Sequence, residues 1–168
     1  MRLVLVPRTF DEEESRSSIA STIYGLVTVL AVIEVLRHHP PSAIASAVTL
    51  FGATVAVALV DVYSEWIASI MTHRRSLYSG EIRLIVREAS TVIIGAQGPT
   101  VVLLLSVFGL MSVPTALVVA RIVALLSLFA IGFRVGQLLH GGRLRQVMSG
   151  LALLAIGALI VLVKAAFH

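Results

Sequence analysis

The sequence contains five long apolar stretches, separated by short segments that contain Arg, Pro, Gly or Ser. About 20 apolar residues are enough to cross the hydrocarbon core of a bilayer as an α-helix. The stretches are continuous and rich in Leu and Ala, whereas a membrane β-barrel alternates apolar and polar residues at every second position. We therefore predict an all-α, polytopic membrane protein. The expected spans cover residues 19–36, 42–72, 91–111, 113–135 and 147–163.

The amino-acid composition excludes a soluble domain. Hydrophobic residues make up 58% of the 168 residues, and charged residues only 13%. A soluble domain carries roughly 25% charged residues and about 45–50% apolar ones. A core of this size cannot hide so much apolar surface from water, so the bilayer is the solvent for most of the chain. Because the sequence has no cysteine, disulfides, thiolate metal sites and cysteine nucleophiles are excluded.

The positions of the arginines predict how the chain is oriented. They concentrate in the arm at residues 1–18 and in the loops after the second and fourth spans, and the opposite side carries only Arg37 and Lys164. Basic residues accumulate on the cytoplasmic side of a membrane. We therefore expect a cytoplasmic N-terminal arm at 1–18, a transmembrane domain at 19–168 and an external C-terminus. The excess of arginine over lysine favours a bacterial cytoplasmic membrane.

Four local motifs resemble those of the vacuolar iron transporter family. Residues 24–28 (Tyr-Gly-Leu-Val-Thr) look like its Asn-Asp-Gly-Leu-Val-Ser/Thr signature, and residues 64–69 (Ser-Glu-Trp-Ile-Ala-Ser) look like its Gly-Glu-Tyr-x-Ser segment. Residues 98–114 carry a similar order of proline, apolar helix, Phe-x-x-Gly-like turn and second proline. Residues 143–150 are similar to its basic entry into the last helix. The resemblance extends over about residues 19–165.

This resemblance implies a transporter and not an enzyme. Members of that family move ferrous iron or manganese out of the cytoplasm in exchange for protons, usually as homodimers. The implied ligand is thus the transported Fe²⁺ or Mn²⁺, with no resident cofactor and no nucleic-acid partner. Residues 73–88 are too short for the cytoplasmic metal-binding domain that many members carry, although some relatives lack it. No catalytic constellation supports the other possibility of an enzyme that acts on lipid.

Two positions depart from the family pattern. The family has an Asp directly before its Gly-Leu-Val, where this sequence has Tyr24, and a Met one turn before the Glu of the second span, where this sequence has Asp61. Either the metal site has been rebuilt with swapped ligands, or the transport chemistry has been lost or changed. The alternative function is therefore a non-transporting membrane scaffold or interaction protein. A dry interior, with Ser106 and Ser149 as the polar residues of the third and fifth spans, favours that alternative.

Asp61 and Glu65 are the candidates for binding a metal ion or a proton. They are four residues apart and so lie on one face of a helix. Two carboxylates one turn apart offer oxygen ligands suited to Mn²⁺ or Fe²⁺, and they can also share a proton, because like charges in a dry site raise one pKa. The alternative is a solvated acidic pair at the membrane edge. Tyr24, at a similar depth in the first span, is expected to line the same entrance.

Glu34 and Arg121 are candidates for an ion pair inside the membrane. A charged group in hydrocarbon costs several kcal/mol, so such residues pair with each other or mark a functional site. Arg121 lies about two turns inside the fourth span, and Glu34 lies near the outer end of the first, so their depths are compatible. The alternative for Arg121 is contact with lipid headgroups. Gly132 and Gly136 form a Gly-x-x-x-Gly motif, which permits close helix contact.

Overall fold

The structure, a computed structural model, describes residues 9–38, 41–73, 90, 93–138 and 142–166. Its regular structure over these ranges is helical and contains no strand, which confirms the predicted all-α class. The helices are α1 (Thr9–His38), α2 (Ala43–His73), α4 (Gly98–Val107), α5 (Val113–Leu138) and α6 (Arg143–Ala166). The predicted basic loop over residues 74–89 and the first eight residues of the arm lie outside the described ranges.

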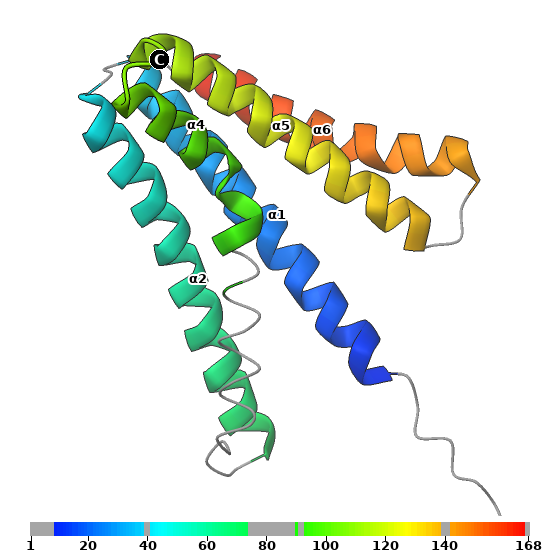
Figure 1. Ribbon diagram of the computed structural model, residues 1–168. Coiled ribbons are helices and arrows are strands. Elements are labelled where there is room, and N and C mark those ends of the chain that lie inside the picture. The colour runs from blue at the N-terminus through cyan, green and yellow to red at the C-terminus, as the bar shows by residue number, and fades with distance from the viewer. Residues whose placement is uncertain (1–8, 39–40, 74–89, 91–92, 139–141, 167–168) are drawn as a thin grey trace, which may run out of the picture.

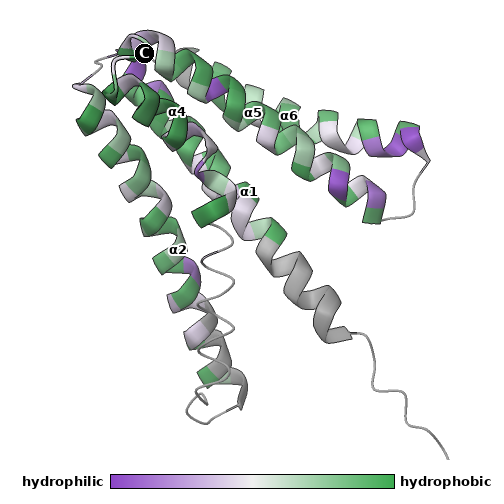
Figure 2. Cartoon of the chain, in the orientation of Figure 1, coloured by the Kyte–Doolittle hydropathy of each residue, from purple (hydrophilic) through white to green (hydrophobic). Residues whose placement is uncertain are grey.

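Within the described ranges, four helices are long and apolar enough to cross a membrane, as an integral membrane protein requires. Figure 2 shows hydrophobic residues along most of their length. They match the first, second, fourth and fifth predicted spans, with ends that differ by up to eight residues. The apolar segments are Ile19–His38, Ala43–Ser64, Val113–Leu138 and Arg143–Val163. α1 itself begins ten residues before its apolar segment, so part of the predicted arm is helical.

The third predicted span is interrupted. Residues 93–96 are helical, Gln97 is not, and α4 then begins at Gly98 with Pro99 in its first turn. Proline lacks an N–H and fits the first turn of a helix but not its interior, so the break falls where the sequence places Pro99. The ten residues of α4 rise only about 15 Å, which is half of the ~30 Å hydrocarbon core.

A tight turn joins α4 to α5. Gly109 has a φ of 75°, and its N–H donates to the Ser106 carbonyl at 3.0 Å, while the Leu110 N–H donates to the Leu105 carbonyl at 3.2 Å. Glycine reaches this left-handed conformation without a Cβ clash, which suits the end of a helix. Ser112 then accepts a hydrogen bond from the Thr115 N–H at 3.4 Å and caps α5. The turn sends α5 back along the bundle.

The described helices fall into two groups. In Figure 1, α2 lies beside both α1 and α4, whereas α5 and α6 form a hairpin that diverges from α1. Glycines let the hairpin helices touch: a Cβ on Gly132 would lie 2.6 Å from the Ser149 carbonyl oxygen, and a Cβ on Gly136 would lie 2.6 Å from Gln146 Cα. The Gly-x-x-x-Gly motif therefore serves a contact within the chain.

The apolar core forms where α1 meets α5. Leu26, Leu30 and Ile33 on α1 are fully buried. The facing residues on α5 include Ala120 and Ala124, which are also fully buried and whose small side chains allow a close approach. This contact aligns the last turns of α1 with the first half of α5, and it positions the charged residues described next.

Candidate functional site: a buried carboxylate with two arginines, and a polar face on α2 and α4

Glu34 is the most deeply buried charged side chain in the part of the chain that the structure describes, with 4% of its side chain exposed. It follows Ile33 on the inner side of α1, in the second-last turn of the helix. Burying a carboxylate without partners is costly, because the protein interior replaces its hydration poorly. The surrounding helices must therefore supply the donors.

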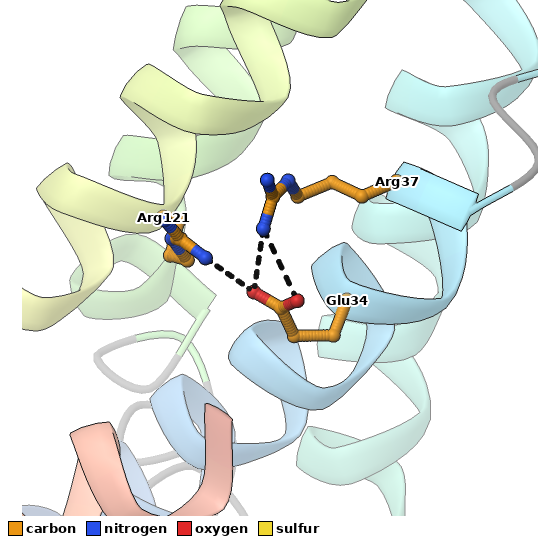
Figure 3. Close-up of polar contacts among 3 residues, drawn as sticks. All are labelled: Glu34, Arg37 and Arg121. Carbon is orange, nitrogen blue, oxygen red and sulfur yellow. Dashed lines mark hydrogen bonds and ion pairs between the residues drawn. The ribbon is translucent and has the colours of Figure 1, made fainter. Parts of the chain in front are cut away.

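Two arginines from different helices supply those donors (Figure 3). Nη1 of Arg121, on α5, lies 3.2 Å from Glu34 Oε1. Nη1 of Arg37, one turn further along α1, lies 3.3 Å from Oε2 and 3.4 Å from Oε1. The structure thus brings together Glu34 and Arg121, the two residues whose similar predicted depth in the membrane indicated an ion pair. It adds Arg37, whose place at the end of the first span predicted only a charge in the following loop.

The three-residue cluster of Glu34, Arg37 and Arg121 carries two positive charges against one negative charge. Each guanidinium has five N–H donors, and over the described residues only Nη1 of each arginine is engaged. The side chains of Arg37 and Arg121 are 33% and 27% exposed. The remaining donors can therefore meet a group from outside the protein. The i, i+3 spacing of Glu34 and Arg37 on one helix was the sequence signal for this third member.

Asp61 lies on α2 inside the apolar segment Ala43–Ser64 and is half-buried. Its Oδ2 is buried and has no hydrogen-bond partner among the described residues. Glu65 lies one turn later on the same continuous helix, and its side chain is outside the described part of the structure. Among described residues, no group of three or more His, Asp or Glu side chains is close enough to hold a metal ion. The joint role of Asp61 and Glu65 therefore stays a prediction.

Tyr24 projects from α1 with 57% of its area exposed. Its carbonyl accepts a hydrogen bond from Thr28 Oγ1 at 3.0 Å, a contact within α1. No hydrogen bond joins the described side chains of Tyr24 and Asp61, so the predicted role of Tyr24 in lining an entrance also stays a prediction.

A set of hydroxyl groups is buried on α2 and α4, which pack against each other. Ser46 and Thr54 on α2 are fully buried, and Thr100 and Ser106 on α4 are at least nine-tenths buried. Thr54 Oγ1 donates to the Leu50 carbonyl at 3.0 Å, which is the usual hydrogen bond of a hydroxyl group inside a helix. The hydroxyls of Ser46, Thr100 and Ser106 have no partner within the described ranges.

These hydroxyls make the interior more polar than the dry interior predicted from the sequence. Of the four, only Ser106 was singled out from the sequence. Helical spacing was the available signal, because Ser46, Thr54 and Asp61 are separated by eight and seven residues and so fall on one side of α2. A buried polar atom without a partner is uncommon in native proteins and calls for a physical explanation.

Comparisons with known proteins identify no relative of this chain. No protein-family model matches it, and neither a curated protein nor a solved structure is significantly similar to it.

Proposed function

We propose that this protein is a membrane transporter that moves a divalent metal cation, Fe²⁺ or Mn²⁺, out of the cytoplasm in exchange for protons. The observation that carries the proposal is Asp61, whose Oδ2 is buried in an apolar helix without a hydrogen-bond partner over the described residues. Ionisable groups inside membrane spans are costly and mark ion or proton pathways. The resemblance of the motifs at 24–28 and 64–69 to the vacuolar iron transporter family supports the choice of ion.

Asp61 and Glu65 bind the ion in this proposal. They lie one turn apart on α2, and carboxylate oxygens suit Mn²⁺ and Fe²⁺. When the metal leaves, the two carboxylates share a proton, since two negative charges in a dry site repel each other. Alternate occupation by metal and proton couples export to proton entry. Tyr24 lines the approach from the cytoplasmic side.

The buried hydroxyls supply the rest of the path. Ser46 and Thr54 lie on α2 toward its start, and Thr100 and Ser106 lie on the packed helix α4. A cation that leaves its hydration shell needs oxygen ligands along its route, and hydroxyl oxygens can replace water molecules one at a time. The three hydroxyls without partners are available for this exchange.

The break before α4 fits the same proposal. Residues 91–111 form the third of five crossings, with the segment 93–96 and α4 as its two parts. Broken helices are tolerated at membrane depth where they border a cavity, and in transporters their unwound carbonyls coordinate ions. The N-terminus is cytoplasmic, the C-terminus is external, and the working unit in the bacterial cytoplasmic membrane is a homodimer.

The second candidate function is a non-transporting membrane scaffold. The observation in its favour is the contact between α1 and α5, where an apolar cluster and the Glu34 ion pairs fill the interface. Such an interface gives a rigid frame without a path for ions. In this alternative Asp61 and Glu65 contact water and headgroups at the membrane edge.

Reconstitution distinguishes the two functions. Liposomes that contain the purified protein are loaded with a metal-sensitive dye, and Fe²⁺ and Mn²⁺ uptake is measured under a pH gradient. The test variants are Asp61→Asn and Glu65→Gln, alone and combined. The control is Glu14→Gln, an equivalent change in the arm before the first apolar segment.

The transporter proposal requires uptake above that of empty liposomes, loss of uptake in the double variant and normal uptake in the control. Absence of uptake of both ions by folded, inserted protein rejects it and leaves the scaffold function. Uptake that survives in the double variant rejects the assignment of the two carboxylates.

A further inference from the structure

The cluster of Glu34, Arg37 and Arg121 has more positive charge than its own carboxylate can neutralise. One guanidinium is sufficient to pair with Glu34, yet two approach it, from α1 and from α5. In Figure 3 the Arg121 guanidinium lies to the left of the carboxylate and the Arg37 guanidinium lies above it. An uncompensated charge in or near hydrocarbon is unfavourable, so the second arginine calls for a second anion.

The cluster lies at a depth that an anion at the membrane surface can reach. Glu34 is four residues from the end of α1, or about 6 Å along the axis, and Arg37 is next to its last residue. Arg121 is eight residues from the start of α5, or about 12 Å, which is less than half of a ~30 Å hydrocarbon core. Arginine side chains extend their charged ends toward the interface from such positions.

The free donors are of the chemical type that binds a phosphate group. Guanidinium N–H groups bind phosphate oxygens in parallel pairs. Only Nη1 of each arginine contacts Glu34, and the described residues provide no other partner for either guanidinium. About a third of the Arg37 side chain and a quarter of the Arg121 side chain are exposed, so both can contact a ligand from outside.

We propose that Arg37 and Arg121 bind the phosphate group of an anion at the membrane surface, with the donors that their contacts with Glu34 leave free. The two sources of such a group are the headgroup of an anionic phospholipid and free inorganic phosphate. Basic pockets between membrane helices bind anionic headgroups by the same physical principle. This site is independent of the proposed transport path, which lies on α2 and α4.

The test measures thermal unfolding of the full-length protein in a neutral detergent. Short-chain phosphatidylglycerol, short-chain phosphatidylcholine and inorganic phosphate are titrated separately at constant ionic strength. A ligand that binds only the folded state raises the unfolding temperature with its concentration. Stabilisation by phosphatidylglycerol but not by phosphatidylcholine identifies the lipid as the source, and stabilisation by inorganic phosphate alone identifies the soluble anion.

Three variants connect the binding to this site. In Arg37→Gln, Glu34 retains its contact with Arg121, so the fold is kept, and affinity for the stabilising anion falls roughly tenfold or more with loss of charge-assisted hydrogen bonds. Arg145→Gln, an exposed arginine at the far end of the hairpin, is the matched control and leaves affinity unchanged. Glu34→Gln removes the competing carboxylate and strengthens binding.

The Glu34→Gln variant separates a binding site from a purely structural ion pair. In a binding site, the variant is more dependent on the anion for stability than the wild type. In a purely structural pair, it loses stability by the same amount with and without the anion. Three outcomes overturn the proposal. All ligands stabilise the protein equally, none of them stabilises it, or Arg37→Gln binds the anion with the same affinity as the wild type.

Discussion

Arg121 on α5 places its Nη1 3.2 Å from Oε1 of Glu34 on α1, across 87 residues of sequence. The contact joins the hairpin of α5 and α6 to the group of α1, α2 and α4, at the end where the two groups meet (Figure 1). Further along, the hairpin diverges from α1. The ion pair therefore contributes to the angle between the two groups as well as to their stability.

Replacing Glu34 with Leu leaves two arginines without a counterion at a partly buried interface. Removing one partner of a buried pair costs about 3–5 kcal/mol, and the partial exposure of both arginines reduces the expected loss to about 1–3 kcal/mol. The free energy of unfolding in mixed detergent micelles measures it. The double variant Glu34→Leu/Arg121→Leu should recover part of the loss. A single variant as stable as the wild type would show that the pair contributes nothing.

Adding a side chain at Gly136 should separate α5 from α6. A Cβ there would lie 2.6 Å from Gln146 Cα, so Gly136→Leu forces the helices apart and loses about 2 kcal/mol or more. Gly52→Ala is the control, because nothing lies within 4 Å of its Cβ position, and alanine is favoured over glycine in a helix by about 0.5–1 kcal/mol. Thermal unfolding of both variants tests the contrast. Equal stability of Gly136→Leu and wild type would contradict the packing.

Thr100→Val should reduce ion uptake without reducing the stability of the protein. The Thr100 hydroxyl is buried without a partner over the described residues, so a valine of the same shape removes an unfavourable polar group and leaves the protein as stable or up to about 1 kcal/mol more stable. If the hydroxyl is an ion ligand, uptake into liposomes falls severalfold. The exposed Thr49 on α2 provides the matched control, Thr49→Val. A large loss of stability in Thr100→Val would mean that the hydroxyl has a structural partner.

Pro99→Ala should lengthen α4 toward residues 93–96. Alanine restores the N–H that proline lacks and removes the restriction on the preceding residue, so Gln97 can join residues 93–96 to α4 in one helix. Far-UV circular dichroism should show equal or slightly greater helix content. Metal uptake should decrease if the break belongs to the transport path. Unchanged uptake together with a continuous helix, measured from amide exchange, would exclude a role for the break.

Much of the fold could be predicted from the sequence because hydrocarbon imposes a simple rule. Apolar runs of bilayer length must be helical, since lipid offers no hydrogen bonds to the backbone. The four long helices follow from that rule, and the ends of three of them lie within about four residues of the prediction. The third span is interrupted next to Pro99, because a proline inside an apolar run breaks or kinks a helix.

The pairing of Glu34 with Arg121 could also be predicted from the sequence, because two opposite charges at similar depth in hydrocarbon have few other partners. Depth alone did not indicate Arg37, since a residue at a helix end can equally turn to water. The Gly-x-x-x-Gly motif predicted a close contact but not its partner, which is α6 of the same chain.

The sequence by itself determined that this protein is helical and built for a bilayer, and which charged residues are costly there. Only the tertiary structure decided that two arginines share Glu34, and that Ser46, Thr54, Thr100 and Ser106 are buried. The physical reason is that hydropathy is a property of each residue along the chain. Burial and hydrogen bonding depend on which helix faces meet, and helix rotation and packing determine those contacts.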